Sequence, residues 1–378
     1  MKKIIVTLIL TLTFSISSHS GDIPLQISIT PLSTTTPYYI VDKKIHIFSE
    51  FIVTNLDRSP VQISKVSLLA LNNKHTLYKQ EFKDKQINKI FANFGSDYLK
   101  EQTPILNVGT SAIIFLETVM DYKKIIPDKI SCYFDLFQND FNRAIVVKTD
   151  PVNIIKTKSI TIAPPVSGKN WISVNGPSNN SLHRRLVMAI NGKLSIPEKF
   201  AVDWVKIDDS KENIFKNDGK SNSDYFSYDQ QILAVADGTV VALKDGIQDN
   251  KISTNNNNLN IDPNNASGNF ITIKIAKDLY ANYAHLREGS IRVKLNSKVH
   301  KGQVIGLLGN SGNSTAPHLH FQLSSSADFY SPNSKSISYK INNFIKHNYG
   351  LDESKKIKIL SSSKISNETV IENTIIDF

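Results

Sequence analysis

Short runs of β-branched and aromatic residues, separated by turn-forming residues, are the feature that most restricts the fold of this 378-residue chain. Between residues 22 and 160, runs such as "KKIHIFSEFIVTNL" (43–56) and "KISCYFDLFQND" (129–140) end in turns rich in Asn, Asp or Pro. This pattern is typical of the antiparallel strands of a β-sandwich. Strand-like runs resume after a Pro-, Gly-, Asn- and Ser-rich stretch at 163–181. We therefore predict an all-β, mainly antiparallel chain, with an accessory β-sandwich domain at 22–160 and a second β-sheet domain at 165–350.

The two ends of the chain differ from this pattern. Residues 1–20 run from "MKK" through the apolar "IIVTLILTLTF" to small polar residues. This layout predicts a secretory signal peptide, with an uncleaved N-terminal anchor as the alternative. No later run is apolar enough to span a bilayer, so we expect an exported protein, periplasmic or secreted, with no stable membrane insertion after signal removal. Residues 351–378 show no clear core pattern, and we expect a loosely attached C-terminal tail.

The composition restricts the possible partners only weakly. A formal net charge of +10 at pH 7 favours anionic partners such as cell-wall polymers or nucleic acid. The lysines are scattered along the chain, however, so we interpret the charge as a solvated surface and expect no nucleic-acid partner. The single cysteine, Cys132, cannot form an internal disulfide. Nothing in the composition indicates an oligomeric state.

The segment "PHLHFQL" (317–323) carries two histidines that are two residues apart. Alternate side chains of a strand point to the same face of the sheet. One face would therefore carry the polar His318, His320 and Gln322, and the other face the apolar Leu319, Phe321 and Leu323. Two histidines on one face can share a metal ion, or one can hold the metal while the other lies beside a substrate. A pair of ordinary surface histidines is the alternative.

Two further segments add residues of the same chemistry. "NYAHL" places His285 in an alternating strand, with Tyr283 on the same face. "FAVDW" places Asp203 on a strand whose other face is apolar. An acid between valine and tryptophan is costly to bury unless it is paired or bound to a metal. His285 and Asp203 are therefore candidates for the same site as the two histidines.

These segments lie within a longer stretch that resembles a known family. "HLREGSIRVKLNSKVHKGQVIGLLGNSGNSTAPHLHFQL" (285–323), with "ILAVADGTVVAL" and "FAVDW" before it, resembles the lysostaphin/LytM-type zinc metallopeptidases. These enzymes cleave peptide cross-links of bacterial cell walls, and the resemblance covers about residues 165–345. It implies a lysostaphin-like antiparallel β-sheet with an open groove, bound Zn²⁺, and peptidoglycan peptide stems or cross-bridges as the partner.

The resemblance also implies roles for single residues. In the family's His-x-His motif the second histidine, here His320, is a zinc ligand and the first, here His318, is catalytic. His285 in "YAHL" would be the other catalytic histidine, and Asp203 matches the aspartate ligand of the family's His-x-x-x-Asp motif. The histidine of that last motif is missing, because Lys199 stands four residues before Asp203. A lysine ammonium group cannot ligate zinc.

A third ligand must then come from elsewhere, since catalytic zinc normally has three protein ligands and one open position. The nearest candidate is His183 in "SLHRRL". If the "NG" turn at 191–192 joins two antiparallel strands, counting back sets His183 opposite Phe200. A bulge near Pro197 would bring it onto the face of Asp203. We therefore hypothesise that His183 supplies the third ligand, with an ordinary surface histidine as the alternative.

The sequence thus favours an exported zinc metallopeptidase that hydrolyses peptide cross-links of peptidoglycan. The main alternative is a catalytically impaired relative that binds the cell wall or regulates a wall amidase. A lipoyl- or biotinyl-type carrier domain is disfavoured, because no lysine stands at a suitable hairpin tip. No HExxH motif is present, which excludes the zincin arrangement. The accessory sandwich would dock against, position or screen the peptidase domain, or act as a spacer.

Overall fold

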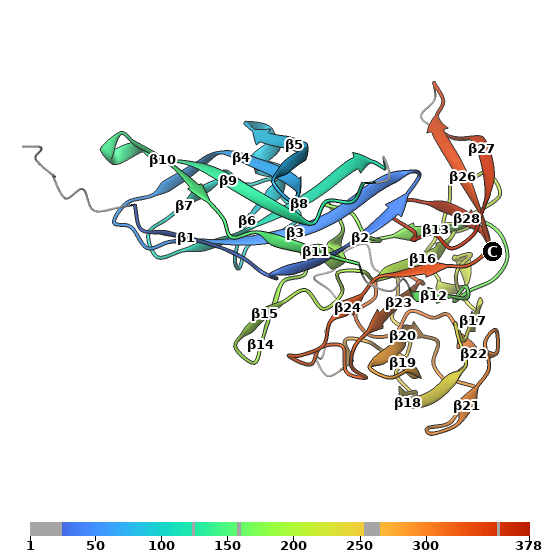
Figure 1. Cartoon of the computed structure of the whole chain (residues 1–378). Helices are drawn as coiled ribbons and strands as arrows, with labels where there is room; N and C mark the ends of the chain where they lie inside the picture. The colour runs from blue at the N-terminus through green and yellow to red at the C-terminus, as the bar shows by residue number, and fades with distance from the viewer. Residues whose placement is uncertain (1–24, 123–124, 157–159, 253–264, 354–355) are drawn as a thin grey trace, which may run out of the picture.

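The structure, a computed structural model, describes residues 25–122, 125–156, 160–252, 265–353 and 356–378. The predicted signal peptide at residues 1–20 lies outside the described residues. Nearly all regular structure is β, and most strand pairs are antiparallel, which confirms the predicted fold class. Figure 1 shows an elongated N-terminal unit that contacts a second β-rich unit near one of its ends. The domain boundaries at 22–160 and 165–350 stay predictions.

The first unit is a two-layered sandwich. Its elements are β1 (Ile27–Pro31), β2 (Thr35–Val41), β3 (Lys44–Asn55), β4 (Val61–Asn72), β5 (His75–Lys83), α1 (Lys85–Ile90), β6 (Phe91–Asn93), β7 (Ile105–Leu106), β8 (Ser111–Asp121), β9 (Lys129–Gln138), the 3₁₀ turn η1 (Asn139–Phe141), β10 (Arg143–Lys148) and β11 (Val152–Ile155). The strand order is β5-β4-β9-β11-β2-β3-β8-β6, with β1 on β3, β10 on β9 and β7 on β4. Between the layers, Phe51 of β3 meets Phe134 of β9 with ring centroids 6.0 Å apart.

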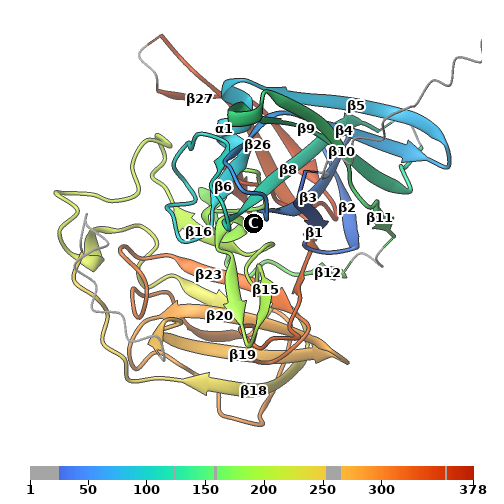
Figure 2. The ribbon, with the colours of Figure 1, turned by 90° about the vertical axis from the view of Figure 1, so that its left-hand side faces the viewer.

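Both faces of β3 are covered, because one sheet of the sandwich lies against the second unit. Ile47 and Phe51 face the sandwich core. Phe48 and Glu50 lie on the opposite face, since side chains alternate along a strand. Phe48 packs in a separate buried cluster with Phe200 of the second unit. The outer face of this sheet is therefore an interface, which Figure 2 shows from the side.

The second unit is built around a long antiparallel sheet. Its elements are β12 (Ile160–Ile162), β13 (Trp171–Val174), α2 (Leu182–Arg185), β14 (Met188–Ile190), β15 (Lys193–Ser195), β16 (Val202–Lys206), η2 (Asn222–Asp224), β17 (Gln231–Leu233), β18 (Gly238–Lys244), β19 (Asn269–Ala276), β20 (Leu279–Leu286), β21 (Lys298–Val299), β22 (Val304–Leu307), β23 (Leu319–Ser324), β24 (Ser336–Ile337), β25 (Tyr339–Ile341), β26 (Phe344–Leu351), β27 (Ile357–Ile365) and β28 (Ile375–Asp377). The order is β21-β18-β19-β20-β23-β16-β13-β28-β26-β27, with β24 on β23. Trp204, Tyr283 and Phe321 are buried in its core.

The C-terminal residues belong to this sheet, which corrects the prediction of a loosely attached tail at 351–378. β28 pairs with both β13 and β26. Ile375 and Ile376 are fully buried, and the ring of Phe378 lies 5.3 Å from that of Trp204. The strand is too short to show a periodic pattern by itself, and its partners are distant in the sequence.

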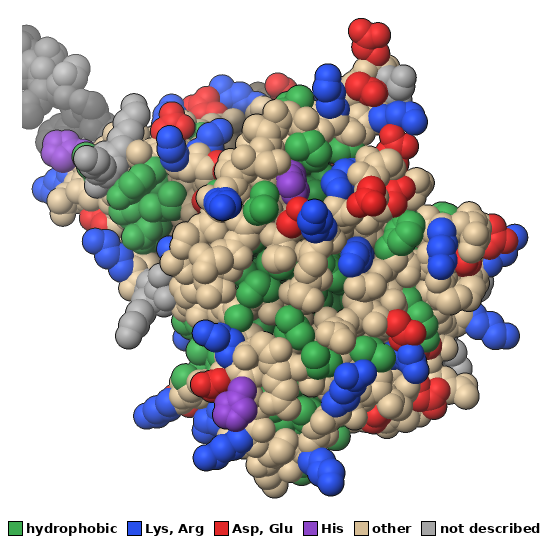
Figure 3. Space-filling view, turned by 90° about the vertical axis from the view of Figure 1, so that its right-hand side faces the viewer, with side chains coloured by type: hydrophobic (Ala, Val, Ile, Leu, Met, Phe, Trp, Pro, Cys, Tyr) green, Lys and Arg blue, Asp and Glu red, His purple; other side chains and the backbone are tan. Residues whose placement is uncertain are grey.

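The face of the molecule in Figure 3 carries dispersed charges, as expected for a solvated surface. On the face that Figure 3 shows, Lys and Arg are interspersed with Asp and Glu and form no continuous basic region.

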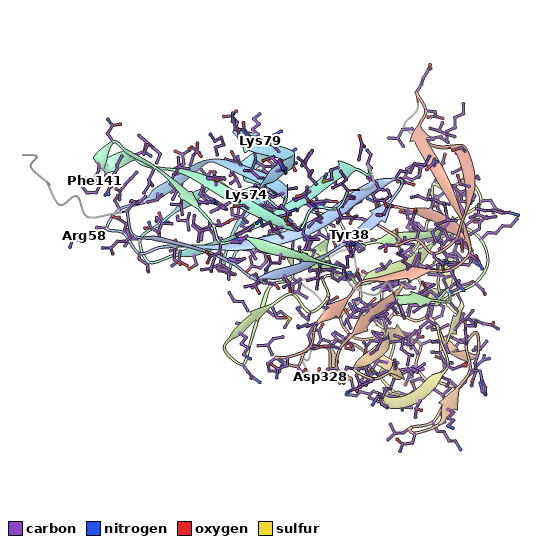
Figure 4. All side chains as sticks on the ribbon, in the orientation of Figure 1. Tyr38, Arg58, Lys74, Lys79, Phe141 and Asp328 are labelled. Atoms are coloured by element: carbon purple, nitrogen blue, oxygen red, sulfur yellow. The ribbon has the colours of Figure 1, made fainter. Side chains whose placement is uncertain are left out.

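Among the described residues, no helix is long and apolar enough to cross a membrane. Cys132 is a free, buried cysteine of the sandwich. Figure 4 shows Arg58 and Phe141 at the end of the sandwich that points away from the second unit.

Candidate metal centre

Asp203 and His320 meet because their strands are neighbours in the sheet. β16 pairs with β23, and Asp203 is the register partner of His320. Directly opposed residues of antiparallel strands share a face, and Asp203 Oδ1 lies 3.1 Å from His320 Nδ1. The alternation expected for β23 is observed, since Leu319, Phe321 and Leu323 are fully buried in the hydrophobic core.

His183 reaches the same carboxylate from outside the sheet. Its Nε2 atom lies 3.3 Å from Asp203 Oδ2, and its ring centroid lies 4.7 Å from that of His320. His183 therefore lies beside Asp203, where the hypothesis of a third zinc ligand requires it. That role itself stays a proposal.

The local structure that delivers His183 differs from the predicted one. The "NG" hairpin has the expected register, with Ile190 opposite Lys193. The pairing stops at Met188, and the residues before it form the helix α2 instead of continuing the strand. The N-cap residue Ser181 accepts a hydrogen bond from a backbone N–H of α2, a common way to start a helix. The predicted route through a bulged hairpin is thus wrong.

Three histidines of the site are oriented by backbone carbonyl groups. The Nδ1 atoms of His183, His285 and His318 lie 2.9, 2.8 and 2.8 Å from the carbonyl oxygens of Asn175, Ser311 and Ala316. Because a carbonyl oxygen only accepts, Nδ1 carries the hydrogen in each ring. Whenever one of these rings is neutral, its Nε2 atom therefore carries the free lone pair. Metal-binding histidines are typically oriented in this way.

His183, Asp203 and His320 fit a metal ion in both chemistry and spacing. One ligand atom from each lies within 4.8 Å of the others, and imidazole and carboxylate are donors that zinc takes. The three residues are only 5%, 6% and 4% exposed. Nε2 of His320 is buried and has no hydrogen-bond partner within the described part of the chain. Such a buried polar atom needs an explanation, and a bound ion provides one.

His285 enters the site through a break in its strand. Tyr283 packs against Phe321 in the core, with ring centroids 5.1 Å apart. A regular strand would therefore also direct His285 into the core. Instead, the register between β20 and β19 shifts and His285 adopts a left-handed φ of 63°, so that its ring lies 4.8 Å from that of His318. The predicted common face for Tyr283 and His285 is wrong, because the bulge turns His285 into the site.

The charges of the site are arranged around Asp203. Burial would raise the pKa of Asp203, but the charges of His183 and His318 and hydrogen bonds from neighbouring histidines hold it well below its usual value. Burial would lower the pKa of His183, but the charge and hydrogen bond of Asp203, with the charge of Glu198, raise it to about 9. Burial and the charge of His318 lower the pKa of His285 well below 6.5, so this imidazole is uncharged at neutral pH.

Asn175, Glu198 and Tyr330 complete the surroundings and were not predicted. Asn175 donates a side-chain N–H to Asp203 Oδ2 at 2.8 Å. Tyr330 donates its hydroxyl hydrogen to Glu198 Oε1 at 2.6 Å, and the other oxygen of Glu198 lies 4.0 Å from His183 Nε2. These residues come from loops without a recognisable motif, so no signal in the sequence could have identified them.

Comparison with known protein families gives a match for part of the second unit. Residues 224–332 match the model of Peptidase family M23. This stretch of the second unit is therefore similar to an M23 domain. The matched range includes His285, His318 and His320. His183 and Asp203 lie upstream of it, so the family match alone would not have indicated them.

Relatives of the M23 domain match only part of the chain. An uncharacterized metalloprotease of Buchnera aphidicola subsp. Baizongia pistaciae is 35% identical over 92 residues, which are 24% of this chain and 19% of the relative. Peptidoglycan DD-endopeptidase ShyA of Vibrio cholerae serotype O1 is 44% identical over 57 residues, which are 15% of this chain and 13% of the relative. The solved catalytic domain of lysostaphin from Staphylococcus simulans is 23% identical and aligns over 44% of this chain and 88% of that chain, with a TM-score of 0.24.

Proposed function

We propose that the protein is a zinc metallopeptidase that hydrolyses peptide stems or cross-bridges of peptidoglycan. The observation that carries the proposal is the convergence of His183 and His320 on the Asp203 carboxylate, at 3.3 and 3.1 Å. His285 and His318 lie beside this group. The M23 match and the similarity to a peptidoglycan endopeptidase support the substrate class.

The residues divide into ligands and proton carriers. His183, Asp203 and His320 would hold the metal ion, which when bound polarises the scissile carbonyl group and lowers the pKa of a water molecule. His285 is uncharged at neutral pH, and its Nε2 atom can accept a proton from the attacking water. His318 also has its Nδ1 atom against a backbone carbonyl oxygen, and its ring lies 4.8 Å from that of His285. It can therefore take part in the same proton transfer. The bond from the water oxygen to the carbonyl carbon forms, the C–N bond breaks, and the histidines return the proton to the leaving amine.

Burial indicates from which side the substrate approaches. The side chains of His183, Asp203 and His320 are 7%, 9% and 6% exposed, whereas that of His318 is 17% exposed. The substrate would therefore reach the site past His318. Since peptidoglycan lies outside the cytoplasm, we place the activity in the periplasm or in a secreted form. The "MKK" segment and the apolar run at the N-terminus support export.

The test is incubation of the purified protein with isolated peptidoglycan sacculi. The zinc-loaded protein should release cross-link peptides, a chelator should abolish the release, and added zinc should restore it. His318→Ala should release none, whereas His300→Ala should behave as the wild type, because the His300 side chain is 86% exposed. Sacculi that stay intact with zinc-loaded wild type would refute the proposal and favour a wall-binding protein or a regulator of an amidase.

A further inference from the structure

α2, the helix that carries His183, is held in place by the sandwich. A helix of 4 residues is not stable by itself, because its few hydrogen bonds do not offset the cost of nucleation. Its position depends on tertiary contacts. Arg185 of α2 donates to the carbonyl oxygen of Tyr98 at 2.7 Å. The backbone N–H of Asn179, just before α2, donates to Glu117 Oε2 at 3.0 Å. Both partners belong to the first unit.

Arg184, the neighbour of His183, is fully buried and is bound mainly by the sandwich. Its Nε and Nη2 atoms lie 3.0 and 2.9 Å from Oε1 of Glu50. Nη2 also donates to the carbonyl oxygen of Leu116 at 2.9 Å, and the guanidinium lies 4.4 Å from the ring centroid of Phe48. A buried guanidinium requires a charged partner, and Glu50 provides that charge.

The second oxygen of Glu50 binds the chain on the other side of the site. Lys199 Nζ lies 2.8 Å from Glu50 Oε2. Lys199 precedes Asp203 by four residues, and Arg184 follows His183 directly. One buried carboxylate, 3% exposed, therefore connects the segment of His183 to the segment of Asp203. Along the chain the two segments are joined by a loop and a short hairpin. The Glu50 connection, together with the contacts of Asn175 to His183 and Asp203, therefore helps to fix their spacing.

We propose that Glu50 of the sandwich is a positioning residue for the metal site. By holding Arg184 and Lys199 together, it holds His183 against Asp203. The inference rests on the proposed metal site and gives the sandwich a direct part in assembling it. Lys199 cannot be a zinc ligand. Its role in this proposal is to bind Glu50 and so to connect the segment of Asp203 to the sandwich.

The first measurement is hydrogen exchange in the metal-free protein. In Glu50→Gln, the amides of residues 179–185 should exchange at least tenfold faster than in the wild type. The matched control is Asp42→Asn, which breaks the 2.7 Å ion pair between Asp42 and Lys346. This pair also joins the two units but does not touch α2. Asparagine fits the left-handed backbone at position 42, where φ is 49°, and exchange at 179–185 should not change.

The second measurement is metal binding. The dissociation constant for zinc, from competition with a chromophoric chelator, should rise about 10–100-fold in Glu50→Gln and stay unchanged in Asp42→Asn. The Co²⁺ absorption spectrum of Glu50→Gln should move toward that of His183→Ala, because the same ligand is displaced. Lys199→Met, which keeps the Glu50–Arg184 pair, should weaken zinc binding about tenfold, and it decides the question if Glu50→Gln does not fold.

The outcomes separate this inference from the proposed function. Unchanged exchange and unchanged zinc affinity in both Glu50→Gln and Lys199→Met would overturn the inference. Equal effects in Asp42→Asn would also overturn it, because they would show a general dependence on docking of the two units. If the wild type takes up no zinc while Glu50→Gln still accelerates exchange at 179–185, the role of Glu50 in holding α2 and His183 in place stands and the proposed function fails.

Discussion

Asp203 and His320 face each other across the β16–β23 pair, with Oδ1 and Nδ1 3.1 Å apart, and His183 meets the other oxygen of the same carboxylate at 3.3 Å. The first contact follows from the register of two neighbouring strands. The second depends on where a four-residue helix is held. Asp203 and His320 are thus positioned by the sheet itself, whereas His183 is positioned by the contacts that hold α2.

Replacing His183 tests the least expected member of the site. His183→Ala should lower zinc affinity by more than about 100-fold, since it removes one of three ligands rather than an outer partner. Competition with a chelator measures the affinity, and His300→Ala is the control. A His183→Ala protein that still binds stoichiometric zinc and still cleaves sacculi would remove His183 from the site.

Replacing His285 separates proton transfer from metal binding. His285→Gln should reduce kcat/KM on a soluble cross-link peptide by about 10²–10⁴-fold, the usual contribution of general acid–base catalysis. The zinc content should stay that of the wild type, because His285 is not among the proposed ligands. Loss of zinc together with activity would show that His285 acts as a ligand instead.

The Glu50 ion pair should make stability depend on pH. Burial would raise the pKa of Glu50, but the charges of Lys199 and Arg184 lower the pKa below its ordinary value of 4.5. A depressed pKa in the folded state means that this stability is present above pH 4.5 and is lost as the pH falls toward the lowered pKa. Glu50→Gln should reduce the free energy of unfolding by about 3–5 kcal/mol at neutral pH.

Urea denaturation of wild type and Glu50→Gln over a range of pH measures this effect. The difference in the free energy of unfolding should shrink in acid, while Asp42→Asn should show a small difference throughout. A Glu50→Gln difference that is constant with pH would mean that the carboxylate charge does not stabilise the interface.

The C-terminal strand should contribute to the core of the second unit. Ile376→Ala should reduce the free energy of unfolding by about 2–5 kcal/mol, because it leaves a cavity at a fully buried position. Leu360→Ala is the matched control: Leu360 is 66% exposed in β27, and its removal should change stability by less than about 0.5 kcal/mol. Equal effects of the two substitutions would support the loosely attached tail that the sequence suggests.

Strand alternation made part of this site predictable. The apolar Leu319 and Phe321 fix which face of β23 carries His320, and the apolar neighbours of Asp203 do the same for β16. His285 shows the limit of this reasoning. A single left-handed residue at a bulge reverses its face, and a histidine carries no sequence signal for that conformation.

The parts that were not predictable depend on contacts between distant segments. His183 lies in a helix whose partners are in β3 and β8, so counting along the local hairpin could not place it. The strand at Ile375–Asp377 pairs with β13, about two hundred residues earlier. Both errors have the same physical origin, because local periodicity does not report on partners that the fold brings from far along the chain.

The most direct test of the account is a crystal structure of the zinc-loaded protein with diffraction data collected at the zinc absorption edge. We predict one anomalous peak bonded to His183, Asp203 and His320, at about 2.0–2.2 Å from each ligand atom. A peak bonded to Asp203 and His320 while His183 lies apart, or a peak elsewhere in the molecule, would contradict the account.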